Sequence, residues 1–191
     1  MYKTIIKKVR HFLLWALSPI ALLLAKFPRT SNRVACNACD KLLTVLKPGD
    51  IIVTRTNWLP TNLIIPGHYK HSVMYVGDEE CIEAVLPVVH RLDLQELLGR
   101  ISEYAVLRPT FADSSEMVKA VSKMNKLVGK PYDLYFEPGS KSFYCSEAIW
   151  FCYRRVVKNW AFTPRERMGV QTVTPNDFYL AKQYFKLIAS H

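Results

Sequence analysis

Short runs of β-branched and other apolar residues, separated by turns, dominate the middle of the chain. Such runs are typical of buried strands. They fall at residues 51–56 and 71–76, between the turn at Gly77-Asp78 and residue 85, and at residues 104–109. Pro48-Gly49 precedes the first run, and both residue types are favoured in turns. The pattern therefore predicts short strands joined by tight connections.

Other segments carry apolar residues at helical spacing. Helices are predicted at residues 34–46, 93–98, 117–128, 146–157 and 175–188. Asp113, with Glu116 three residues later, has the form of a capping box. Pro175 stands at the first position of the last predicted helix, where proline is well tolerated. Residues 163–174 show neither period and are expected to form a loop.

The first 33 residues differ from the rest of the chain in charge. They contain seven Lys or Arg and no Asp or Glu. The remainder has 19 basic and 16 acidic residues, so it carries only +3 of the net charge of +10. We therefore expect a basic, apolar membrane-targeting segment at 1–33 and one globular domain at 34–191. Because the basic excess is local and no nucleic-acid-binding motif occurs, we expect no nucleic-acid partner.

Residues 12–25 form an uncharged apolar run of 14 residues between basic flanks. A helix that spans a bilayer needs about 20 residues. The run fits an uncleaved signal anchor, an interfacial helix on anionic lipid, or a cleaved secretory signal with a poor cleavage site at Leu23-Leu24-Ala25. A buried core helix is the structural alternative. The first two interpretations predict a membrane-associated or cell-envelope protein, and the third a secreted or periplasmic one.

The cysteines do not form a disulfide framework, since their number is odd and their spacing irregular. They are Cys36, Cys39, Cys81, Cys145 and Cys152. Cys36 and Cys39 lack the second ligand pair that a zinc site needs, so we interpret them as two residues on one helix face.

Cys145 stands where an extended run gives way to a predicted helix. A thiol at a helix N-terminus faces unpaired backbone N–H groups and the positive end of the helix dipole, which favour the nucleophilic thiolate. The same N–H groups are placed to hold an oxyanion. A small core residue is the alternative interpretation of this cysteine.

His71 and Glu83 lie on the two predicted strands that flank Gly77-Asp78. A three-residue turn, Val76-Gly77-Asp78, would place them directly opposite each other, with Cβ atoms about 5 Å apart. The carboxylate would then fix the imidazole tautomer. A turn centred on Asp78-Glu79 would place them on opposite faces instead. We favour the first register, although each residue alone also fits a role without chemistry.

Seven segments, taken in order, resemble the circularly permuted, NlpC-like papain-fold cysteine hydrolases of the YiiX/YebB-like type, which are relatives of the lecithin–retinol acyltransferase group. In this branch the histidine precedes the cysteine, as it does here. The chain departs from the common pattern at Ser72-Val73-Met74, where small residues often follow the histidine. The segments, which cover about residues 46–180, are Leu46-Lys-Pro-Gly-Asp50-Ile-Ile, His71-Ser-Val-Met-Tyr-Val-Gly77-Asp78, Ile82-Glu83-Ala84, Val106-Leu-Arg-Pro109, Gly129-Lys-Pro-Tyr-Asp133-Leu-Tyr-Phe136, Tyr144-Cys-Ser-Glu-Ala148 and Thr174-Pro175-Asn-Asp177-Phe178.

The resemblance implies an α+β fold of the permuted papain-like (NlpC) type, with a small antiparallel barrel-like sheet packed on helices. It also implies that Cys145 is the nucleophile, His71 the base and Glu83 the third residue. His68 is a competing candidate for the base, but it falls in the loop before the strand.

The leading hypothesis is a Cys-His-Glu hydrolase that cleaves amide or ester bonds through a thioester and needs no cofactor or metal. Its substrate would be a peptide, including a cell-wall peptide, or a lipid acyl group. A lipid acyltransferase of the same chemistry is one alternative. A membrane-tethered binding module without turnover is another, and the complete Cys-His-Glu set argues against it.

Overall fold

The computed structural model describes residues 34–57, 65–136, 139–158, 160–167 and 169–191. The predictions made for residues 1–33 lie outside these ranges. Among the described residues, no helix is both long enough and apolar enough to cross a membrane.

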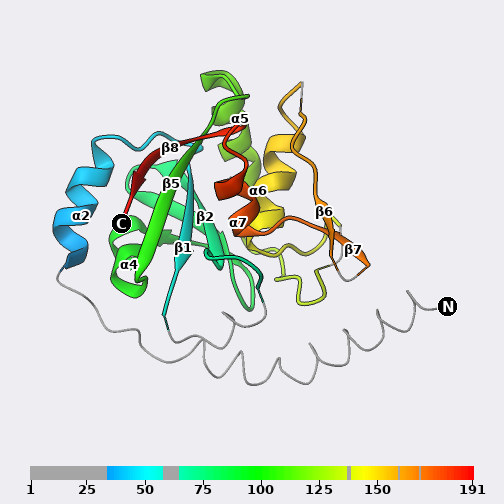
Figure 1. Cartoon of the computed structure of the whole chain (residues 1–191), viewed down its shortest axis with the longest axis horizontal. Coiled ribbons are helices and arrows are strands. Elements are labelled where there is room, and N and C mark those ends of the chain that lie inside the picture. Colours follow the sequence, from blue (N-terminus) through cyan, green and yellow to red (C-terminus); the bar gives the residue numbers. More distant parts are fainter. Residues whose placement is uncertain (1–33, 58–64, 137–138, 159, 168) are drawn as a thin grey trace.

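A six-stranded antiparallel sheet forms the centre of the molecule (Figure 1). The strands lie in the order β4-β3-β2-β1-β5-β8. Their bounds are β1 Ile51–Arg55, β2 His71–Gly77, β3 Glu80–Ala84, β4 Val89–Asp93, β5 Glu103–Pro109 and β8 Phe185–Ser190. The four strands predicted from the sequence, β1, β2, β3 and β5, are present, and an antiparallel sheet packed on helices was the predicted architecture.

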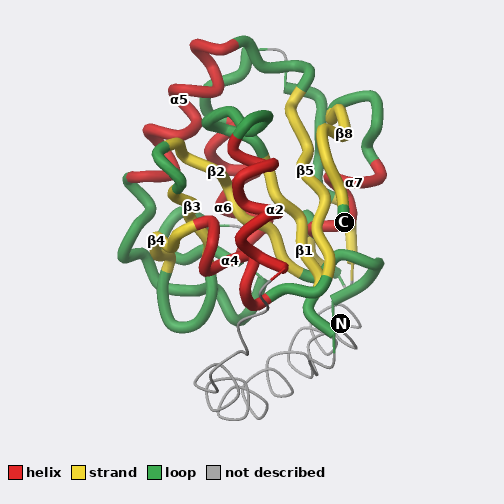
Figure 2. Tube along the Cα trace, turned by 90° about the vertical axis from the view of Figure 1, so that its left-hand side faces the viewer, coloured by secondary structure: helices red, strands yellow, loops and turns green. Residues whose placement is uncertain are grey.

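Helices cover both faces of this sheet. The helices α2 (Val34–Leu43) and α4 (Leu94–Arg100) lie on one face, in front of the strands in Figure 2. The helices α5 (Ser114–Asn125), α6 (Cys145–Arg154) and α7 (Pro175–Leu180) lie on the other side of the strands (Figure 1). The predicted capping box is present at α5, where Asp113 accepts a hydrogen bond from the Glu116 N–H and Glu116 accepts one from the Asp113 N–H.

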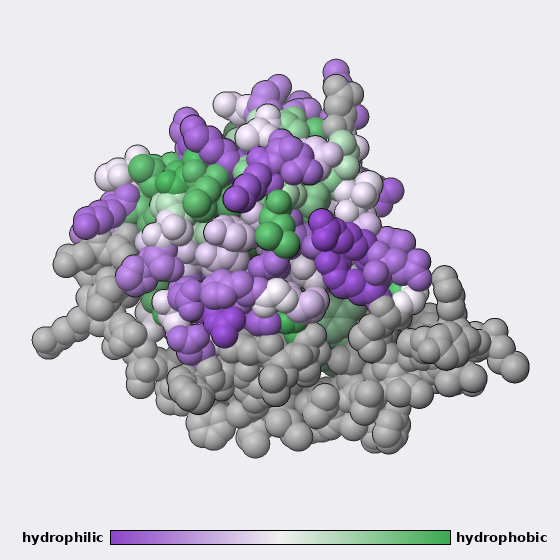
Figure 3. All heavy atoms as spheres, viewed as in Figure 1, coloured by the Kyte–Doolittle hydropathy of each residue, from purple (hydrophilic) through white to green (hydrophobic). Residues whose placement is uncertain are grey.

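Each face of the sheet has its own apolar core because successive strand residues point to opposite sides. Ile51 and Val53 pack with the residues of α5, α6 and α7. Ile52, between them, packs with the residues of α2 and α4 instead. Leu187 of β8 is about half exposed. Figure 3 shows that apolar side chains reach the surface on this view of the molecule, among polar ones.

The β2–β3 hairpin does not have the predicted register. Asp78 and Glu79 form its turn with positive φ angles of 51° and 62°, and Gly77 pairs with Glu80. This turn alone would place His71 and Glu83 on opposite faces. However, a shift between Tyr75 and Gly77 inserts one extra residue, so that Glu83 pairs with Val73. A bulge of this kind reverses the side-chain alternation, and His71 and Glu83 therefore share a face as diagonal neighbours rather than direct partners.

The C-terminal prediction was partly wrong. The last helix ends at Leu180, and residues 185–190 form the edge strand β8, which pairs with β5. Residues 163–174, expected to be a loop, contain the hairpin of β6 (Arg165–Arg167) and β7 (Val170–Thr172). The helix prediction failed at residues 185–190 because pairing with β5, which is distant in sequence, overrides local helix preference. The hairpin was missed for another reason: β6 and β7 have only three residues each, too few to show a strand period.

Two of the segments that carry the family resemblance hold the fold together away from Cys145. Asp50 is fully buried and accepts hydrogen bonds from the Lys47 N–H at 2.8 Å and from Arg108 at 2.8 and 2.6 Å. Asp177 caps α7 by accepting from the Thr174 N–H at 2.8 Å, and it also pairs with Arg167. Buried carboxylates need such partners, so Asp50 and Asp177 have a structural role in these two segments.

Candidate active site

Cys145 is the first residue of α6. The preceding residue, Tyr144, has an extended backbone (φ −91°, ψ 169°) and occupies the N-cap position of the helix. The prediction that the thiol stands at a helix N-terminus is therefore correct. The side chain is buried, and its sulfur lies 3.7 Å from the Ser146 hydroxyl.

His71 lies between Cys145 and Glu83. Its Nε2 atom is 2.6 Å from Glu83 Oε2, and the ring is also hydrogen-bonded to the Cys145 side chain. Because Nε2 is engaged by the carboxylate, Nδ1 is the ring nitrogen that remains for the thiol. The structure thus brings together the three residues that the sequence singled out.

The charges of this group are coupled. Burial opposes a charge on His71, but the Glu83 carboxylate and the hydrogen bond to Cys145 raise the pKa of the imidazole to about 9. Burial likewise opposes a charge on Cys145, but its hydrogen bond with His71 and the imidazolium charge lower the pKa of the thiol below its ordinary value. Together, the two shifts favour a thiolate–imidazolium pair.

Glu83 has two further basic partners. Its carboxylate is almost fully buried, and its Oε1 atom accepts hydrogen bonds from His90 Nε2 at 3.2 Å and from Arg100. Although burial alone raises the pKa of a carboxyl group, His71, His90 and Arg100 hold the pKa of Glu83 well below its usual value. The carboxylate is therefore ionised, with Oε2 left to His71.

The sequence analysis missed His90 and Arg100. His90 lies on β4 and pairs directly with Glu83 of β3, but that strand was not predicted. Arg100 ends α4, beyond the predicted helix. Had β4 been predicted as the strand that follows β3, its pairing would have placed His90 beside the carboxylate.

His68, the competing base, belongs to a different pair. Its half-exposed imidazole lies 2.7 Å from the Glu103 carboxylate, measured from Nε2 to Oε2. Its backbone N–H donates to Asn176. His71 is thus the candidate base at Cys145.

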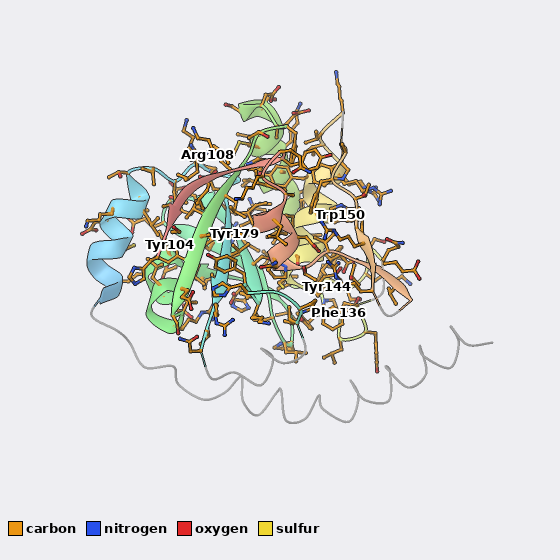
Figure 4. All side chains as sticks on the ribbon, in the orientation of Figure 1. Tyr104, Arg108, Phe136, Tyr144, Trp150 and Tyr179 are labelled. Carbon is orange, nitrogen blue, oxygen red and sulfur yellow. The ribbon has the colours of Figure 1, made fainter. Side chains whose placement is uncertain are left out.

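Aromatic and acidic side chains surround the start of α6. The rings of Phe136 and Tyr144 lie 4.9 Å apart, next to the N-terminal end of the helix (Figure 4). Burial and then the charge of Cys145 raise the pKa of Tyr132 well above its usual value. Burial also raises the pKa of Glu147 to about 8, and this side chain accepts a hydrogen bond from the Gly139 N–H at 3.2 Å.

This geometry has counterparts among known proteins. The model of a family described as permuted papain-like amidase enzymes, YaeF/YiiX, C92 family, matches residues 45–190. The chain belongs to this family. The matched range includes Cys145, His71 and Glu83, and the chain is accordingly an amidase-like cysteine hydrolase with the permuted papain-like fold that the sequence predicted.

A solved structure supports the same fold for this C92-family chain. It is described as metalloprotein yiiX from Escherichia coli O157:H7, and it superposes with a TM-score of 0.64 at 19% identity. The alignment covers 77% of this chain and 98% of that one. A comparison with curated proteins gave no match.

Among the described residues, no three His, Cys, Asp or Glu side chains are grouped so that they could hold a metal ion. The Glu83 carboxylate instead has His71, His90 and Arg100 as its partners.

Proposed function

We propose that this chain hydrolyses an amide bond through Cys145, with His71 as acid and base and Glu83 as the residue that orients His71. The observation that carries the proposal is the continuous hydrogen-bonded line from Cys145 through His71 to Glu83. Its charge state supports the same roles, because a thiolate held beside an imidazolium is a nucleophile at neutral pH.

Acylation begins with attack of the Cys145 thiolate on the carbonyl carbon of the substrate. The C=O electron pair moves to oxygen, and the backbone N–H groups at the start of α6 are placed to hold the resulting oxyanion. When the carbonyl re-forms, the C–N bond breaks and His71 gives its proton to the leaving nitrogen. The products of this step are a free amine, a neutral His71 and a thioester on Cys145.

Deacylation reverses the role of His71. The imidazole takes a proton from water as the water oxygen attacks the thioester carbon, and the C–S bond then breaks to release a carboxylic acid. Cys145 leaves as a thiolate beside the imidazolium, which restores the starting pair. Glu83 keeps Nε2 bonded throughout, so that Nδ1 continues to face the reacting atoms.

The substrate that we favour is an amide, either a peptide such as a cell-wall peptide or a lipid amide. The family is described as one of amidases, and this supports an amide over an ester. The side chain of Phe136, which is half-buried and packs on Tyr144, is an apolar group near Cys145 that could contact such a substrate. Transfer of the acyl group to an amine or alcohol uses the same thioester, and product analysis with and without such an acceptor separates transferase from hydrolase.

The experiment that tests the proposal is alkylation of the folded protein with iodoacetamide from about pH 5 to 9, with mass spectrometry to locate the adduct. We expect Cys145 to react rapidly at pH values where an ordinary thiol is protonated. The chain contains its own control in Cys152, whose pKa burial raises to about 12. In His71→Ala, Cys145 should lose this advantage, and an equally slow Cys145 in the wild type would refute the proposal.

We also propose that residues 1–33 associate the enzyme with a membrane. Seven cationic side chains flanking or near an apolar run support this, since such segments bind anionic lipid surfaces. Deletion of residues 1–33 should release the protein from anionic vesicles in a sedimentation assay. Sedimentation of the truncated protein equal to that of the full chain would contradict the idea.

A further inference from the structure

Ser72 is a fully buried residue of β2, immediately after His71. Its backbone pairs with Val53 of β1. Its hydroxyl oxygen is buried and has no hydrogen-bond partner among the described residues. A buried hydroxyl without a partner lowers stability, and native structures hold few such groups without a functional reason.

The hydroxyl is on the Cys145 side of the sheet. Side chains alternate along β2, so Ser72 points to the same side as Met74, which packs in the core formed with α5 and α6. The pKa of the Cys145 thiol is lowered mainly by His71, then by Ser146, and the Ser72 side chain acts in the same direction. The oxygen is therefore near the sulfur without having a hydrogen-bond geometry in the resting arrangement.

We propose that Ser72 is a further catalytic residue, whose hydroxyl donates a hydrogen bond to the Cys145 sulfur whenever that sulfur carries negative charge. A small rotation of the hydroxyl about its Cα–Cβ bond is the only change required. The proton stays on Ser72 Oγ, and no covalent bond forms or breaks at this residue. The inference rests on the proposed thiol chemistry and adds Ser72 to His71 and Ser146 as a donor to the thiolate.

The same hydrogen bond acts twice in a reaction cycle. It stabilises the thiolate before attack, and it stabilises the departing thiolate when the tetrahedral intermediate of deacylation breaks its C–S bond. In the thioester the sulfur is neutral, and the bond weakens. Such a donor raises the fraction of ionised Cys145 before attack and makes the thiolate a better leaving group in deacylation.

The test is Ser72→Ala in the full chain, measured by the pH dependence of Cys145 alkylation with iodoacetamide. Loss of a donor to the thiolate should raise the apparent pKa of Cys145 by on the order of one unit, which is about a tenfold slower reaction below that pKa. The melting temperature should stay the same or rise, because an unpaired buried hydroxyl has been removed. A merely structural serine predicts no change in the pH profile.

Thr172→Val is the matched control. The Thr172 hydroxyl is also buried without a hydrogen-bond partner among the described residues, but it lies on β7 and outside the Cys145 group. This variant should share the stability effect and leave the pH profile unchanged. Ser72→Thr retains a hydroxyl and should keep the low pKa, which provides a second reading if the alanine variant folds poorly.

The outcomes separate the two proposals. A wild-type Cys145 with an ordinary pH profile would overturn the thiol hydrolase itself. A wild-type Cys145 with a low pKa that Ser72→Ala leaves unchanged would overturn only the role of Ser72. A shift of equal size in Thr172→Val would also overturn it, because the effect would then not depend on contact with the sulfur.

Discussion

Two thiols on helix α6 have opposite chemical character, although both are buried. Cys145 opens the helix, and Cys152 follows about two turns later. The Cys152 sulfur lies 3.8 Å from the Met124 sulfur in the apolar core, and burial raises the pKa of the thiol to about 12. At Cys145 burial acts in the same direction, yet the pKa is lowered.

The difference between the two thiols lies in the neighbouring strands rather than in the helix. His71 of β2 is hydrogen-bonded to Cys145, and Glu83 of β3 favours the charged form of that imidazole and raises its pKa. Cys152 instead packs in an apolar core. A buried cysteine becomes a nucleophile only where a positive charge offsets the desolvation of the thiolate. The reactivity expected of Cys145 therefore depends on the side chains of the sheet and not on α6 alone.

The largest expected effect comes from Cys145→Ala. Turnover should fall by about 10⁴-fold or more, because the proposed thioester forms on the sulfur that this change removes. Alanine is small enough for the buried position, so the far-UV circular dichroism and the melting temperature should remain near those of the wild type. Residual amidase activity at the wild-type rate would mean that the reaction does not pass through this sulfur.

Glu83→Gln should have the next largest effect, and it should act on the pH profile. The carboxylate raises the pKa of His71 to about 9, so activity that depends on imidazolium is expected to persist up to that pH in the wild type. In the variant this upper limb should move to lower pH, since a neutral amide no longer favours the charged ring. The rate near neutral pH should fall roughly 10- to 100-fold, less than the loss on removing a general acid–base group such as His71.

The position of the upper limb gives the decisive reading for Glu83. If the rate falls but the limb stays at its wild-type pH, the carboxylate contributes to folding and not to the charge of His71. Kinetics at several pH values, combined with urea unfolding, separate these two results.

Arg100→Met tests whether the Arg100 guanidinium stabilises the buried Glu83 carboxylate. Its loss removes one of the two partners of Glu83 Oε1 and should lower the free energy of unfolding by about 1–3 kcal/mol, as expected when a buried charged group loses a hydrogen bond. Activity should fall less than in Glu83→Gln, because His71 and His90 remain. The control is Glu96→Gln, which removes only an exposed pair to Arg100 at 4.0 Å and should change neither quantity. Equal stability of both variants would show that Arg100 does not hold Glu83.

The sequence was sufficient to single out Cys145, His71 and Glu83, but not to predict the strand register that brings His71 and Glu83 together. The helix starting at Cys145 and the strands of His71 and Glu83 carry local signals, namely turns, β-branched runs and a change of hydrophobic period. The predicted turn was wrong, and the two residues share a face only because a bulge follows Tyr75. A bulge is set by the pairing of whole strands and leaves little local trace.

The features that the sequence did not predict all depend on contacts between different secondary-structure elements. His90 reaches Glu83 through the β3–β4 pairing, and Arg100 reaches it from the end of α4. The edge strand β8 forms because β5 offers it a pairing partner. For Arg100 and β8 the deciding interaction joins segments far apart in the chain, which composition and periodicity do not reveal. His90 is closer, since β4 follows β3 directly and a prediction of that strand would have placed it.

The smallest expected effect on activity comes from Cys152→Ala, which changes the unreactive thiol of the pair. Removal of a buried sulfur leaves a small cavity beside Met124, so the free energy of unfolding should fall by about 1 kcal/mol. Turnover and the pH dependence of Cys145 alkylation should match the wild type, because Cys152 has no part in the His71–Glu83 line. The two alanine variants should thus show opposite effects: Cys145→Ala loses activity but not stability, and Cys152→Ala loses stability but not activity. A loss of activity in Cys152→Ala that exceeds its loss of folded protein would show instead that the two ends of α6 are coupled, and that the packing around Met124 helps to position the thiolate.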